Sequence, residues 1–168
     1  MISKATLENV FEITTLVNSA YRGETSKKGW TTEAHLLKGT RITEKELTAV
    51  LLNTKNTVLI YQENLKIIGT VLLTNNKTEL YLGMLTISPE LQNSGLGKKL
   101  LQTSEDFARS LNLPKIVMKV ITIREELVAW YQRNDYLDIG KREALPVILN
   151  DVLLHTETLE FMILEKIL

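Results

Sequence analysis

The stretch that decides the fold reads Met84-Leu85-Thr86-Ile87-Ser88-Pro89-Glu90-Leu91-Gln92-Asn93-Ser94-Gly95-Leu96-Gly97-Lys98-Lys99-Leu100-Leu101. Its first residues predict the end of a strand, which Pro89 stops because proline has no amide donor. Gly95 and Gly97 allow a tight turn and a close backbone approach to a ligand. Apolar residues then recur at helical spacing over 95–111, so a helix follows the turn. The free amides and positive dipole end of this helix favour a phosphate or pyrophosphate.

Two familiar phosphate motifs do not fit this turn. A Walker A loop needs glycine at 92 and serine or threonine at 99, where the chain has Gln92 and Lys99. The dinucleotide fingerprint would start at Gly95, but its third glycine is replaced by Leu100. A purely structural use of the two glycines stays open at this point.

The rest of the chain predicts helices and strands in one α+β domain spanning 1–168. Before the turn, helices are expected over 6–21 and 44–53, the latter with a Thr43/Glu46 capping box, and a short amphipathic piece lies between them at 33–38. Three strands with short connections form an antiparallel meander at 58–61, 67–73 and 79–87. After the turn and its helix come strand 116–121, helix 124–134, and strands near 136–140 and 159–168. Residues 143–157 are interpreted as a loop, and the sheet as mixed.

Composition excludes several classes of protein. The chain has 168 residues, no cysteine, two histidines and a formal net charge of zero. Without cysteine there is no disulfide scaffold or thiolate metal site, and no metal is expected. Zero net charge argues against nucleic-acid binding. No apolar run reaches the roughly 18 residues that span a membrane, and no signal peptide is seen, so a cytoplasmic location is expected.

Three stretches together resemble the GNAT superfamily of acyl-CoA-dependent N-acyltransferases, and within it a bacterial subset of unassigned substrate. One is the Q-x-x-G-x-G pattern of residues 92–97 between a strand and a helix. Another is Glu126-Leu127-Val128-Ala129-Trp130-Tyr131-Gln132-Arg133-Asn134-Asp135-Tyr136. The third is the N-terminal pair of segments 17–23 and 29–33. The order of elements agrees with that family over nearly the whole chain.

The resemblance implies an acetyl-CoA site between two splayed strands. The backbone of Leu85, Thr86 and Ile87 would pair with the pantetheine arm, and the Leu85 amide would stabilise the oxyanion. The pyrophosphate would lie against a loop formed by Gln92, Asn93, Ser94, Gly95, Leu96, Gly97 and Lys98. Arg124 stands where the family commonly has an asparagine that binds the CoA arm, so a contact with a CoA phosphate or with the substrate is expected of it.

Catalytic and acceptor residues also follow from the resemblance. Tyr131 matches the tyrosine that protonates the leaving thiolate, although packing beside Trp130 is the alternative. Glu79 is a candidate general base, with Glu24 and Glu33 as others, while His35 and His155 are interpreted as surface residues. The residues expected to bind the acceptor are Tyr21, Arg22, Trp30 and Tyr81, together with Arg41 and the 143–157 loop. Arg22 or Arg41 would hold a substrate carboxylate.

The sequence therefore predicts an N-acetyltransferase that moves an acetyl group from acetyl-CoA directly to a primary amine of a small molecule or peptide. The absence of cysteine excludes a covalent cysteine intermediate. A non-catalytic acyl-CoA-binding or sensing module is the alternative, and a structural interaction domain is a third. The expected partners are acetyl-CoA and an amine, without nucleic acid or membrane. A homodimer is expected by analogy.

Overall fold

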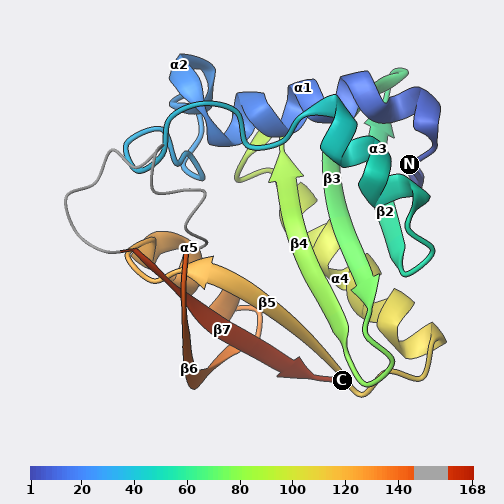
Figure 1. Cartoon of the computed structure of the whole chain (residues 1–168), viewed down its shortest axis with the longest axis vertical. Coiled ribbons are helices and arrows are strands. Elements are labelled where there is room, and N and C mark those ends of the chain that lie inside the picture. The colour runs from blue at the N-terminus through green and yellow to red at the C-terminus, as the bar shows by residue number, and fades with distance from the viewer. Residues whose placement is uncertain (146–158) are drawn as a thin grey trace.

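The computed structural model describes residues 1–145 and 159–168. They form one mixed sheet in the order β1-β2-β3-β4-β5-β7-β6 (Figure 1). The strands are β1 Ile2–Lys4, β2 Asn56–Glu63, β3 Lys66–Asn75, β4 Leu80–Ile87, β5 Lys115–Ile121, β6 Leu137–Ala144 and β7 Glu160–Ile167. The α-helices are α1 Val10–Tyr21, α2 Gly23–Ser26, α3 Glu44–Leu52, α4 Leu96–Ser110 and α5 Glu125–Gln132. Two short 3-10 helices cover Leu7–Asn9 and Pro89–Leu91.

Helices cover both faces of the sheet because side chains alternate along its strands. In β2, Val58 and Ile60 pack in a core with α1 and α3, whereas Leu59 points to the opposite core with α4 and α5. Figure 1 shows α1 and α3 in front of the strands and α4 behind them. The site therefore lies in a three-layer arrangement whose middle layer is the sheet.

The sheet opens between β4 and β5. These two strands run parallel and are paired at Leu80 with Ile116 and at Tyr81 with Val117. Past these pairs they diverge, as Figure 1 shows. The β3–β4 register also shifts next to Met84, whose φ is +52°. A bulge of this kind re-aims the backbone, and it lies directly before Leu85.

The α+β class, the mixed sheet and the antiparallel meander are confirmed. The capping box at Thr43 is also confirmed, with the Thr43 amide donating to Glu46 Oε2 over 2.7 Å. The short amphipathic piece at 33–38 contains a turn at 34–36, and its Leu36 and Leu37 are buried against Ile121. The sequence does not predict β1 and α2, because they have three and four residues and are too short to show a periodicity. None of the helices in the described residues is long and apolar enough to cross a membrane.

Candidate active site

The glycine turn at the start of α4 leaves backbone amides without partners. Asn93 and Gly95 both adopt positive φ, +67° and +85°, which carries the chain sharply from Pro89 into the helix. Gly95 is the N-cap residue and has no side chain to accept from the first turn. The first helical bond runs from the Lys99 amide to the Gly95 carbonyl, over 3.1 Å. The amides of residues 96–98 are therefore available to an anion at the positive end of the helix.

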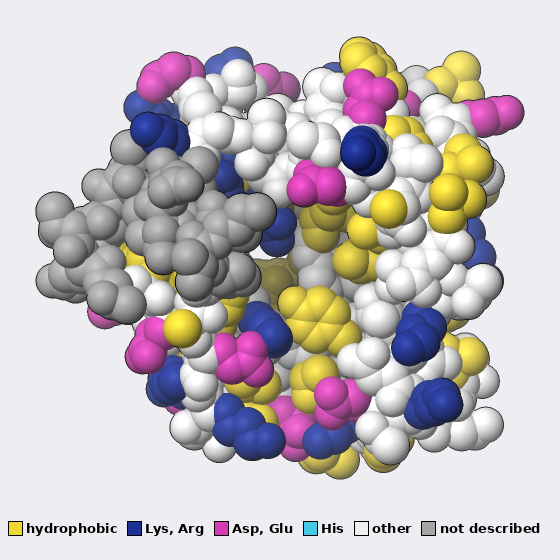
Figure 2. Space-filling model, in the orientation of Figure 1, with side chains coloured by type: hydrophobic (Ala, Val, Ile, Leu, Met, Phe, Trp, Pro, Cys, Tyr) yellow, Lys and Arg dark blue, Asp and Glu magenta, His cyan; other side chains and the backbone are white. Residues whose placement is uncertain are grey.

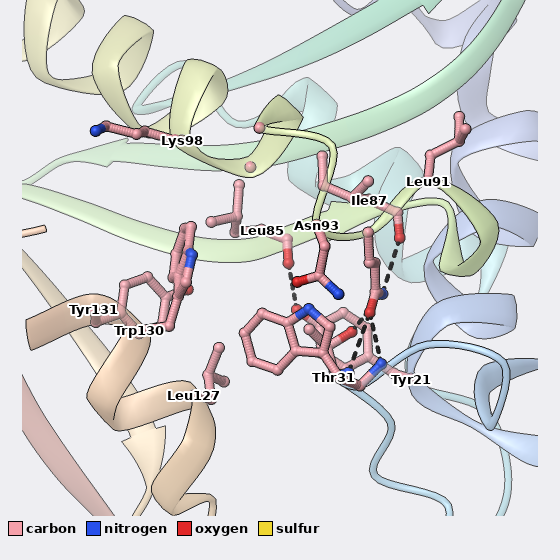
Figure 3. Close-up of a pocket in the computed structure, with 14 residues that line it drawn as sticks. Tyr21, Thr31, Leu85, Ile87, Leu91, Asn93, Lys98, Leu127, Trp130 and Tyr131 are labelled. Atoms are coloured by element: carbon pink, nitrogen blue, oxygen red, sulfur yellow. Dashed lines mark hydrogen bonds between the residues drawn. The ribbon is translucent and has the colours of Figure 1, made fainter. Parts of the chain in front are cut away.

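A cavity of about 590 Å³, here the loop cavity, lies beside this turn. Figure 3 shows its walls, which come from β4, the turn, α5 and the N-terminal segment. Its lining residues are Tyr21, Trp30, Thr31, Leu85, Ile87, Leu91, Gln92, Asn93, Gly95, Gly97, Lys98, Leu127, Trp130 and Tyr131. Among the described residues, this lining includes a lysine but no carboxylate, which suits an anionic ligand.

The structure brings together most of the residues expected at the cofactor. Leu85, Ile87, Gln92, Asn93, Gly95, Gly97 and Lys98 all line the loop cavity. Four others do not, and one of them, Arg124, is described below. Thr86 is buried and its hydroxyl donates to the Met84 carbonyl over 3.0 Å. Ser94 donates to the Leu91 carbonyl over 2.5 Å, and Leu96 packs against the core.

The Gln92 side chain binds protein instead of facing a free ligand. Its Oε1 accepts from the amides of Trp30 and Thr31, at 2.8 and 3.3 Å. Its Nε2 donates to Thr31 Oγ1 at 2.7 Å and to the Ile87 carbonyl at 3.3 Å. A Cβ on Gly29 would stand 2.5 Å from Gln92 Oε1, so a side chain there would push the Gln92 amide out of this position. We call residues 29–33 the roof segment, and Gln92 fixes one end of it.

Arg124 fixes the other end of the roof segment. Its guanidinium donates to the Thr31 carbonyl and, over 3.0 Å, to Glu33 Oε1. Glu33 also accepts from Arg22 Nε over 3.3 Å, and Arg22 donates to the carbonyls of Lys38 and Thr40. All three charged side chains are at most 10% exposed. The sequence predicts that Arg22 contacts an acceptor and that Arg124 contacts a CoA phosphate or the substrate. In this structure both guanidiniums are bonded within the protein.

Tyr131 is a buried residue in the wall of the loop cavity. The residue is 6% exposed, and its ring meets Trp130 edge to face at a centroid distance of 5.0 Å. Its hydroxyl makes no hydrogen bond to a described residue. The hydroxyl oxygen is not one of the fully enclosed atoms that lack a partner, so it retains some exposure. Burial, followed by the nearby Tyr21 and then Tyr81, raises the pKa of Tyr131 far above its ordinary value of 10.0, against a smaller opposing effect of Arg124. The phenol thus keeps its proton at neutral pH.

A second cavity, here the strand cavity, has a volume of about 1090 Å³ and lies between β4 and β5 on the side of α1. Figure 2 shows hydrophobic and basic side chains around a hollow on this face. Four residues line both cavities: Tyr21, Leu85, Leu127 and Tyr131. The Tyr21 hydroxyl donates to the Leu85 carbonyl over 2.5 Å, drawn as a dashed line in Figure 3. The two cavities therefore meet at Leu85 and Tyr131.

The remaining candidates fall at different places. Tyr81 lines the strand cavity and Trp30 the loop cavity. Glu79 lines neither; its carboxylate lies 3.5 Å from Lys115 Nζ, and its position is six residues before Leu85, about 20 Å along an extended strand. Glu24 is exposed and pairs with Lys27, and His35 is exposed. His155 and most of the 143–157 loop lie outside the described residues.

Sequence reasoning missed part of the wall contributed by α5. Leu127 lines both cavities and Trp130 lines the loop cavity, where a Cβ on Gly97 would stand 3.4 Å from the Trp130 ring. The i, i+3, i+4 spacing of Leu127, Trp130 and Tyr131 marked one face of this helix. The spacing did not show that the face looks into an open sheet.

A family model described as the acetyltransferase (GNAT) family matches residues 10–136. The chain belongs to the GNAT acetyltransferase family. Many solved structures share the fold of this GNAT protein. An N-acetyltransferase from Staphylococcus aureus Mu50 is 15% identical with a TM-score of 0.76, over 99% of this chain and 96% of that one.

Two further structures are similar to this GNAT protein. A ribosomal-protein-alanine N-acetyltransferase from Brucella melitensis is 14% identical, with a TM-score of 0.74 over 100% of this chain and 99% of that one. A structure from Bacillus anthracis str. Ames, in complex with acetyl coenzyme A, is 18% identical and has a TM-score of 0.61. The match covers 72% of this chain and 67% of that one. No curated protein matches the chain. Acetyl transfer from acetyl-CoA is the activity of the family.

Proposed function

We propose that this protein transfers the acetyl group of acetyl-CoA directly to a primary amine of a small molecule or peptide. The observation that carries the proposal is the meeting of the two cavities at Leu85 and Tyr131. Acetyl-CoA enters through the loop cavity and the amine through the strand cavity. A thioester and an amine held on either side of one backbone position need no covalent enzyme intermediate.

The loop cavity has the parts that a CoA diphosphate and its pantetheine arm require. The uncapped amides at residues 96–98 and Lys98 supply positive charge, and the apolar Ile87, Leu127 and Trp130 flank the channel. Beyond the Tyr81–Val117 pair, the edges of β4 and β5 diverge, so an extended arm fits beside β4 as an added strand. Leu85 lies just past the bulge, and its amide is assigned to the thioester carbonyl oxygen.

The residues at the junction divide the work of the reaction. The amine nitrogen attacks the thioester carbonyl carbon, a C–N bond forms, and the Leu85 amide stabilises the oxyanion. When the C–S bond breaks, Tyr131 protonates the leaving thiolate and later recovers a proton from water. The acetylated nitrogen releases its extra proton to water. The product pair is an N-acetyl amine and free CoA.

No carboxylate among the described residues at the junction is available as a base. Glu33 is the one carboxylate among the described lining residues of the two cavities, and two arginines hold it. Glu79, the candidate from sequence, lies just before β4 and six residues before Leu85, far from the junction. The amine therefore reacts as the free base that is present in solution, so we do not assign a general base to Glu79.

The loop is tested by replacing Gly95 with valine. At φ +85°, a side chain costs about 1–2 kcal/mol, and the strained turn no longer presents its amides as it does now. Gly140→Val is the matched control, because Gly140 has φ +79°, open space around it, and lies in β6 away from both cavities. We expect similar losses of stability in both variants, but at least about a tenfold weaker acetyl-CoA affinity in Gly95→Val alone.

Isothermal titration gives the affinity, and release of the CoA thiol across a panel of amines gives turnover. Equal acetyl-CoA affinity in the two variants contradicts the loop assignment. Tight acetyl-CoA binding by the wild-type protein with no thiol release on any amine supports the non-catalytic binding module in place of the enzyme.

A further inference from the structure

The strand cavity carries an excess of positive charge. Four charged residues among the described ones line it: Glu33, Arg41, Lys119 and Arg124. Lys119 is neutralised by Glu143, whose carboxylate lies 2.5 Å away. Glu33 is shared between Arg124 and the buried Arg22, so this group of three keeps one positive charge. Arg41 adds another, since it forms no ion pair with a described residue.

Arg41 differs from the two buried arginines in having a guanidinium that is still free to bind. Arg22 and Arg124 use their N–H groups on Glu33 and on backbone carbonyls. The Arg41 guanidinium makes no hydrogen bond to a described residue, and the residue is exposed. An arginine fork in this state is suited to bind a carboxylate through two parallel hydrogen bonds.

The position of Arg41 links it to the point of transfer. Its guanidinium carbon lies 5.8 Å from the centroid of the Tyr21 ring, and the Arg124 guanidinium lies at the same distance. The hydroxyl of that ring is bonded to the Leu85 carbonyl. An acceptor that spans Tyr21 thus has its amine at Leu85 and its other end at Arg41.

We propose that the acceptor is a small amine that carries its own carboxylate, of the amino acid class, and that Arg41 binds that carboxylate. This inference rests on the proposed acetyl transfer to an amine. The excess positive charge attracts an aminocarboxylate and repels polycationic acceptors such as polyamines and aminoglycosides, which would need an acidic pocket.

The test uses acceptors in matched pairs, each amino acid with its carboxamide, and spermidine as a polycation. Thiol release gives kcat and KM for the wild-type protein and for Arg41→Gln and Arg41→Lys. Lys45→Gln is the charge-matched control, because Lys45 is exposed on α3 and lines neither cavity. Arg41 is exposed, so its variants are expected to fold, and thermal melting checks this.

We expect the wild-type protein to prefer the acid over its amide by at least tenfold in kcat/KM and to leave spermidine largely unmodified. Arg41→Gln should raise the KM for the acid until acid and amide are used alike, Arg41→Lys should retain part of the preference, and Lys45→Gln should retain all of it. Acetyl-CoA affinity should be the same in all four proteins.

Two different failures are distinguishable in the same samples. If the wild-type protein acetylates amides or spermidine at least as fast as the acids, or if Arg41→Gln slows acid and amide equally, the inference is wrong and the proposed acetyl transfer stands. If acetyl-CoA does not bind, the proposed function fails, and the inference fails with it.

Discussion

At the scale of single residues, Tyr131 and Tyr136 offer a comparison between two buried phenols with different partners. Both lie in the same aromatic row, with ring centroids 6.0 Å apart. The Tyr136 hydroxyl is bonded to Glu105 over 3.2 Å, whereas Tyr131 is one of the residues that line both cavities. A phenol with a bonded hydroxyl contributes to stability, and one that faces a junction is placed to give a proton.

Replacing each tyrosine by phenylalanine should therefore give opposite results. Tyr131→Phe should lower kcat by about 100-fold or more, the usual contribution of a positioned acid, with little change in acetyl-CoA affinity. Tyr136→Phe leaves the buried Glu105 without one donor and should cost about 1–3 kcal/mol of stability with kcat retained. Steady-state kinetics and urea unfolding measure the two effects. An unchanged kcat in Tyr131→Phe would remove Tyr131 as the acid.

The pH profile of the wild-type enzyme gives a second readout of the same residue. Tyr131 must hold its proton to donate it, and burial raises its pKa above the ordinary 10.0. A raised pKa keeps the acid form present to higher pH, so activity should not fall on the alkaline side before pH 10. Activity should rise toward the pKa of the amine, because the amine reacts as the free base. An alkaline fall below pH 10 that disappears in Tyr131→Phe would contradict this.

At the scale of elements, the roof segment joins parts of the chain that are distant in sequence. Gln92 lies in the glycine turn before α4, and Arg124 lies just before α5. Both bind residues 29–33. Gln92 lines the loop cavity, which is proposed to hold acetyl-CoA, and Arg124 lines the strand cavity. If both anchors are needed to keep the roof segment ordered, binding of one substrate affects the binding of the other.

Gln92→Ala removes the loop-side anchor and is expected to free the amides of Trp30 and Thr31. Their hydrogen exchange should become at least about tenfold faster, and the KM values for acetyl-CoA and amine should both rise. Gln102→Ala is the control, since Gln102 lies exposed on α4 and bonds only weakly to Asp106 at 3.4 Å. Unchanged exchange at Trp30 and Thr31 would show that Arg124 alone holds the segment.

The pattern of elements was largely predictable, because each helix and long strand carries its own periodicity. The turn before α4 was predictable for a similar reason: Gly95 adopts φ +85°, a conformation that favours glycine, and sequence displays this directly. The role of Arg22 and Arg124 was not, since it depends on Glu33 meeting both across 11 and 91 residues of chain. Charged side chains that sequence marks as ligand-binding candidates can instead be paired with protein groups that only the tertiary fold brings close.

At the scale of the whole molecule, the two halves of the sheet are joined along β4 and β5 by two residue pairs. The cores behind these halves are further connected through α4 and α5. The diverging edges of β4 and β5 leave backbone groups that a bound pantetheine arm would pair with. Ligand binding should therefore stabilise the sheet at its opening, besides stabilising the folded state by mass action.

Acetyl-CoA at 100 times its dissociation constant should raise the free energy of unfolding by about 2.7 kcal/mol. At the same fixed concentration Gly95→Val should gain less than the wild-type protein, and Gly140→Val should gain as much. Urea unfolding with and without acetyl-CoA measures this, and hydrogen exchange locates it. Protection is expected to increase along residues 82–87 of β4, more than at β1 and β2, which lie away from the opening. Stabilisation spread evenly over all strands would contradict binding in the opening, because a ligand inserted there orders those edges first.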